Sequence, residues 1–157
     1  MNSRIILLSV LSAVVVSVAP NIAKTQSEVG LSSGVTSAQK TQSMPGTLHD
    51  TMKAMAKLLK QVISQSNDSS RNASSAALAE QFAMVTHHAK NFVPDSLLSL
   101  PANQRGQAIS QFNELLDEVT EQGHSLSRAF VAGDNAKAAQ ILAQLDLLKK
   151  QGHGLFK

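Results

Sequence analysis

The chain has 157 residues, a formal net charge of +3, and no Cys, Trp or Tyr. That length supports one ordinary domain. The lack of Cys excludes a disulfide scaffold, a thiolate zinc site, an iron–sulfur cluster and a Cys nucleophile. Gly and Pro are scarce whereas Ala and Leu are common, which favours helices, and the absence of a Lys/Arg run argues against nucleic acid as a partner.

Residues 1–23 have the pattern of a secretory signal peptide. Arg4 precedes an apolar stretch, Ile5 to Ala19, whose length of about 15 residues is short of the roughly 20 that cross a bilayer as a helix. We expect cleavage after Ala23, a periplasmic location and no stable membrane insertion of the mature chain. Residues 24–45 are rich in Ser, Thr and Gln without an apolar period, which predicts a flexible polar leader.

Residues 46–157 carry four apolar stripes at helical spacing. The spacing predicts helices over about 47–66, 71–91 and 103–132, and a fourth from 134 to 152 or beyond, with 94–101 as a connection. Gly133 and Asp134 form a helix boundary, and Gly123 in the third stripe predicts a close helix approach or a bulky neighbour. Four amphipathic helices with short or moderate connections predict an all-α fold, an antiparallel up-down-up-down four-helix bundle.

In this topology, most soft and titratable ligands fall at one end of the bundle. The first helix starts where the second and fourth helices end, so that end gathers His49, Met52, Met55, His87, His88 and His153. His124 is expected at the other end, in a surface ion pair with Glu121.

A Met facing a His across a bundle end suits a low-spin haem iron, which accepts a thioether sulfur on one face and an imidazole nitrogen on the other. With both axial positions filled, no position is left for O₂ or substrate, which predicts an electron carrier and not an enzyme. Without Cys, the haem would be held non-covalently in an apolar slot. Candidates to line that slot are Leu48, Met55, Phe112, Leu116 and the Leu145–Leu148 region.

Two segments resemble the cytochrome b562 family. The stretch Leu48-His49-Asp50-Thr51-Met52 and onward to Lys60 is similar to the opening helix of that family. The stretch from Gly133-Asp134 to His153 is similar to its last helix. The resemblance covers residues 46–157 and implies one non-covalent haem b per chain, with Met52 and His153 as the axial ligands of the iron. It implies redox proteins as partners, and we expect a monomer.

Two other functions fit the same residues. The first is a haem-free bundle that binds copper or another metal through His49, His87 and His88, since His and Met are the thiol-free ligands of copper. It predicts that His87 or His88 lies near His49. The second is a metal-free interaction protein, in which Met52 fills a closed core and His153 lies in solvent. No Ser-His-Asp order, paired carboxylate motif or Gly-rich phosphate loop supports an enzyme.

Overall fold

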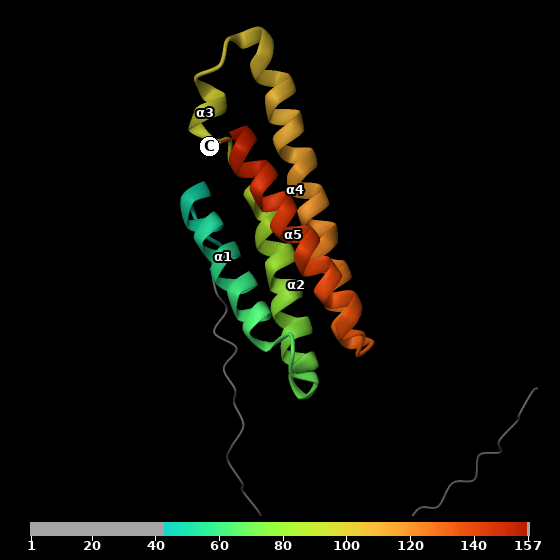
Figure 1. Cartoon of the computed structure of the whole chain (residues 1–157). Coiled ribbons are helices and arrows are strands. Elements are labelled where there is room, and N and C mark those ends of the chain that lie inside the picture. Colours follow the sequence, from blue (N-terminus) through green and yellow to red (C-terminus); the bar gives the residue numbers. More distant parts are fainter. Residues whose placement is uncertain (1–42, 157) are drawn as a thin grey trace, which may run out of the picture. The chain divides into compact units, whose positions relative to one another are not determined.

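A computed structural model describes residues 43–156, and the predicted signal peptide and nearly all of the predicted leader lie outside the described residues. The elements in chain order are α1 (Leu48–Gln65), the short 3₁₀ helix η1 (Ser69–Arg71), α2 (Asn72–Ala89), α3 (Asp95–Leu98), α4 (Ala102–Val131) and α5 (Asn135–Phe156). The long helices α1, α2, α4 and α5 correspond to the four predicted ones, and Figure 1 shows them lying along one another. The predicted all-α bundle is confirmed.

α1 begins close to its predicted start because a polar residue caps it, and it ends where the chain turns into η1. Thr47 is the N-cap: its hydroxyl oxygen accepts from the backbone N–H of Asp50 at 3.1 Å. Beyond Gln65 the chain turns through η1, where the Asp68 carboxylate accepts from the backbone N–H of Ser70 at 3.0 Å. The polar break predicted between the first two helices is therefore a capped turn.

The boundary between α4 and α5 is a Schellman motif. Gly133 has a φ of 71°, a left-handed conformation that favours glycine. Its backbone N–H donates to Phe130 O at 3.0 Å, and the N–H of Asp134 donates to Ala129 O at 2.9 Å. The Asp134 carboxylate then accepts from the backbone N–H of Lys137 at 2.8 Å, which caps α5.

The connection over 94–101, predicted without an element of its own, contains α3. Its Leu97 is buried, because the connection folds back on the bundle and covers one end of the core. Proline residues stand immediately before α3 and before α4, where a missing N–H is tolerated. The segment was missed because four residues are too few to establish a helical period.

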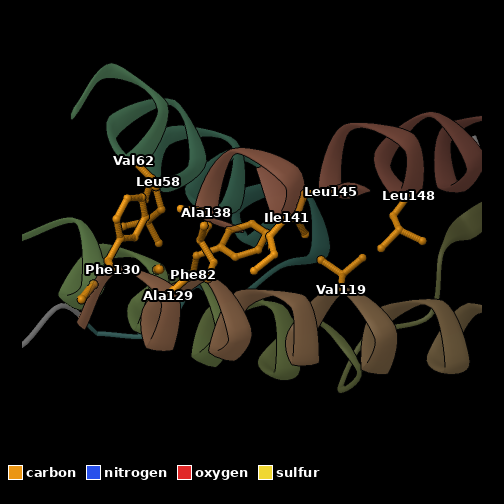
Figure 2. Close-up of a cluster of buried hydrophobic side chains, with 13 residues drawn as sticks. Leu58, Val62, Phe82, Val119, Ala129, Phe130, Ala138, Ile141, Leu145 and Leu148 are labelled. Atoms are coloured by element: carbon orange, nitrogen blue, oxygen red, sulfur yellow. The ribbon is translucent and has the colours of Figure 1, made fainter. Parts of the chain in front are cut away.

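Two clusters of apolar side chains form the core. Figure 2 shows the first, to which α1, α2, α4 and α5 all contribute. Its members include Leu58, Val62, Phe82, Phe130 and Leu145. The second is described with the site. Burying each large side chain of this kind stabilises the fold by about 1.5–3 kcal/mol.

Close backbone contacts join α1 to α2, α2 to α4, and α4 to α5. Within residues 43–156, α1 and α5 make scarcely any such contact, although their side chains meet in the first cluster. Among the described helices, none has the length and apolar character needed to cross a membrane.

Candidate functional site

One end of the bundle brings together the start of α1, the end of α2 and the end of α5. His88 Nε2 lies 2.9 Å from the carbonyl oxygen of Pro45, which precedes α1. Ser96 in α3 donates its hydroxyl to the carbonyl oxygen of Phe156 at 2.7 Å. In Figure 1 the red end of α5 lies beside α3, above the teal start of α1. The expected shared end of these three helices is therefore present.

The second apolar cluster lies at this end. Its buried members are Ala89, Leu97, Phe112 and Leu116, and its partly buried members include Leu48, Met52, Met55 and Phe156. Four residues expected to line an apolar slot, Leu48, Met55, Phe112 and Leu116, are thus gathered around Met52. The Leu145–Leu148 region belongs to the first cluster instead.

Phe156 also belongs to this cluster, although it was not among the residues predicted to line the slot. Its ring packs edge-on against that of Phe112, with 5.3 Å between centroids and 78° between planes. The pattern could have predicted this, because Phe156 lies eleven residues beyond the buried Leu145 and so falls on nearly the same face of α5.

Met52 lies on the flank of α1 that is turned away from α2. Gln65 marks the flank toward α2, because its side chain accepts a hydrogen bond from Ser74 of α2. At about 100° per residue, Met52 lies about 140° round the helix from Gln65. The other neighbour of α1 in the bundle order is α5, so Met52 is on the side of α1 nearer to α5. Its side chain is half-buried.

His153 lies beside the packed face of α5 and not on it. Gly152 belongs to that face, because a Cβ there would lie 2.9 Å from Leu115 Cδ2 of α4. His153 is about 100° further round the helix. Its side chain is exposed, and none of the hydrogen bonds found among residues 43–156 engages its imidazole. The helix continues through both flanking glycines to Phe156.

The acidic side chain nearest in helical phase to His153 is Asp146, seven residues earlier on α5. Hydrogen bonds from Lys150 and Lys149 lower the pKa of Asp146 to about 2. The carboxylate is therefore ionised at neutral pH. It forms ion pairs with two lysines of α5, with Nζ–O distances of 2.7 Å to Lys150 and 2.9 Å to Lys149.

The three histidines of the predicted alternative metal site differ in their surroundings. His88 uses both ring nitrogens: Nε2 faces the Pro45 carbonyl oxygen, and Nδ1 lies 3.1 Å from Asn91 Nδ2. His87 and His49 are exposed. His87 and His88 line a hollow of about 420 Å³, and His49 is not among its lining residues.

His124 also lines this hollow, so its predicted place at the opposite end is wrong. Its Nδ1 lies 3.0 Å from the carboxylate of Glu80 on α2, whereas Glu121 pairs with Arg128 at 2.6 Å. The predicted Glu121–His124 ion pair is therefore wrong as well. Asn72, the first residue of α2, hydrogen-bonds Asn135 just after α4, so the start of α2 lies level with the end of α4 and His124 lies level with the middle of α2.

The donor set at this end consists of thioether and imidazole groups. Within residues 43–156, no group of three His, Asp or Glu side chains is placed to hold a metal ion. A partly buried methionine and an exposed histidine, at the end of the bundle that holds the second apolar cluster, instead fit a cofactor that carries its own metal and needs apolar contacts on its faces.

Comparison with known proteins gives a family. The Cytochrome b562 family model matches residues 47–157, which include every helix that the structure describes. Searches of the curated proteins and of the solved structures gave no match. The family comprises haem-binding, electron-transfer four-helix bundles. The family match agrees with the four long helices that the structure describes, and this chain belongs to the cytochrome b562 family.

Proposed function

We propose that this protein is a periplasmic electron carrier that binds one haem b non-covalently, with Met52 and His153 as the axial ligands. The observation that supports the proposal is the apolar cluster that Met52 joins at the end of the bundle where α5 finishes. α1 and α5 are also the two bundle neighbours whose backbones scarcely touch.

The residues present fit such a group. The thioether of Met52 and the imidazole of His153 are the donor pair of a high-potential, six-coordinate haem. When bound, the haem supplies a one-electron couple. Leu48, Met55, Phe112 and Phe156 would supply its apolar contacts, and together they would exclude water from the iron. With the iron held by two side chains, no position would remain for a substrate, which suits electron transfer and not catalysis.

The proposal is tested by titrating the purified chain with haemin and recording oxidised and reduced spectra. We expect saturation at one haem per chain and a sharp low-spin ferrous spectrum. Met52→Leu and His153→Gln should each lose that spectrum, because either change removes an axial ligand while preserving much of the side-chain volume. Met84→Leu and His49→Gln are the matched controls and should retain it, because each removes the same donor type at an exposed position outside the apolar cluster.

Two outcomes would overturn the proposal. The first is the absence of stoichiometric haem uptake by a chain whose helical circular dichroism is intact. The second is a low-spin spectrum that survives in Met52→Leu and His153→Gln but is lost in one of the control variants, which would assign the ligands elsewhere.

The location and the partners follow from the sequence pattern. We propose export through residues 1–23, a leader over 24–45, and a monomer that meets redox proteins of the periplasm. N-terminal sequencing of the protein isolated from the periplasm, where the chain should begin at Lys24, tests the cleavage, and light scattering tests the oligomeric state.

A further inference from the structure

A second set of soft donors lies away from the flank assigned to the haem. The hollow of about 420 Å³ is lined from α2, from α4 and from the segment before α1. Its lining residues are Met44, Ala83, Met84, His87, His88, Asn91, Thr120 and His124. Met44 and Met84 are about half exposed, at 48% and 47%, so their sulfur atoms are not needed to fill the core.

We propose that this hollow is a Cu(I) site, with Met84, His87 and His124 as ligands and Met44 as a fourth donor. Thioethers are ligands that Cu(I) accepts and that most other biological cations do not. Met84 and His87 are three residues apart on α2 and therefore share a face of that helix. His124 faces them from α4 across the same hollow.

His124 is already arranged as a metal ligand. A carboxylate can only accept, so the contact of 3.0 Å between Nδ1 and Glu80 places the ring proton on Nδ1. Nε2 of the neutral ring then carries the lone pair. A histidine whose second nitrogen donates to a carboxylate has a fixed tautomer and orientation, as metal-bound histidines almost always have.

His88 has a different part in the same hollow. The Pro45 carbonyl accepts from its Nε2, so Nδ1 accepts from the Asn91 amide and no lone pair remains for a metal. The contact between His88 and Pro45 holds the segment that contains Met44 against the end of α2. His88 is therefore a positioning residue for Met44 and not a ligand.

The Cu(I) site and the haem site use different flanks and share no residue. Copper would bind the face formed by α2 and α4, whereas Met52 and His153 lie on α1 and α5. The two proposals therefore fail independently, and each can be tested in variants that lack the other site.

The experiment is a competition titration of the full chain with Cu(I) under anaerobic conditions, against a chromophoric Cu(I) chelator. We expect one Cu(I) per chain. Met84→Leu and His124→Gln should abolish stoichiometric binding. Glu80→Gln should weaken the affinity about 10–100-fold, because it removes the acceptor that orients His124 and leaves all the ligands in place.

The controls are Met52→Leu, Met55→Leu and His49→Gln, which remove the same donor types at positions outside the hollow and should leave Cu(I) binding unchanged. X-ray absorption of the copper complex should show sulfur as well as nitrogen neighbours. The proposal is overturned if the chain holds no Cu(I) against the chelator, or if binding survives in Met84→Leu and His124→Gln. Loss of binding in Met52→Leu alone would also overturn it, because copper would then occupy the α1 and α5 end.

Discussion

Gly123 of α4 lies directly against Ala83 of α2, so closely that a Cβ at Gly123 would stand 2.9 Å from the Cβ of Ala83. It would also lie 3.1 Å from Cδ1 of Phe82. The sequence predicted either a close approach or a bulky neighbour at this glycine, and both are present. The face of α2 that meets α4 carries small side chains, including Ser75, Ala79 and Ala83, which lets the two helices approach.

Gly123→Ala should lower the free energy of unfolding by about 1–3 kcal/mol, because the backbone of Ala83 blocks the added methyl group. Gly106→Ala is the matched control on the same helix. Nothing lies within 4 Å of its added Cβ, so the change should stabilise the protein by up to about 1 kcal/mol through helix propensity. Urea unfolding followed by circular dichroism measures both. Equal effects of the two substitutions would contradict the close packing.

Asp134→Ala should lower the free energy of unfolding by about 1 kcal/mol, because the backbone N–H of Lys137 loses its acceptor. Asp134→Asn keeps an oxygen acceptor and should lose much less. Thermal unfolding of the two variants, compared at the same pH, checks the cap. If the Asn variant were destabilised as much as the Ala variant, the hydrogen bond would not be the cause.

The carboxylate of Asp146 should titrate near pH 2. Because its pKa is lowered from the ordinary value of 3.8, the ion pairs with Lys150 and Lys149 contribute stability above that value, and the contribution is lost as the pH falls toward 2. Side-chain NMR of the carboxyl carbon measures the pKa directly.

Lys150→Ala should raise the pKa of Asp146, since Lys150 is its first hydrogen-bond donor. Asp68 is the internal control, because the hydrogen bonds that lower its pKa come from Ser70 and not from a lysine. A pKa of Asp146 that stays near 2 in Lys150→Ala would show that this lysine is not the cause.

Phe156→Ala should loosen the last turn of α5, because the ring contact with Phe112 ties that turn to α4. An aromatic pair contributes about 0.5–1.5 kcal/mol beyond the buried area. Faster amide hydrogen exchange over residues 152–156 is the expected readout. Leu155→Ala is the adjacent control, since Leu155 is 61% exposed, and it should leave the exchange unchanged. Similar exchange in both variants would mean that the ring does not hold the turn.

The sequence predicted the elements of this protein well because helix signals are local. The Thr47 cap, the Gly133-Asp134 boundary and the apolar stripes at spacings of three and four each lie within a few residues of the feature they specify. The same reasoning placed Leu48, Met52, Met55 and Phe112 at one end of the bundle, and the structure brings them into one cluster. The assignment of Met52 and His153 as haem ligands stays a prediction.

The sequence by itself therefore determined the four helices, their limits, the shared bundle end and the family. Only the tertiary structure decided which side chains of different segments come together: Glu80 pairs with His124, Phe112 packs on Phe156, and Met44, Met84 and His87 line one hollow. The physical reason is that a helical period fixes the direction of a side chain about its own axis, whereas the axial offset between two helices depends on how their surfaces pack. Gly123 and Ala83 set that offset for α2 and α4, and with it the level at which His124 stands.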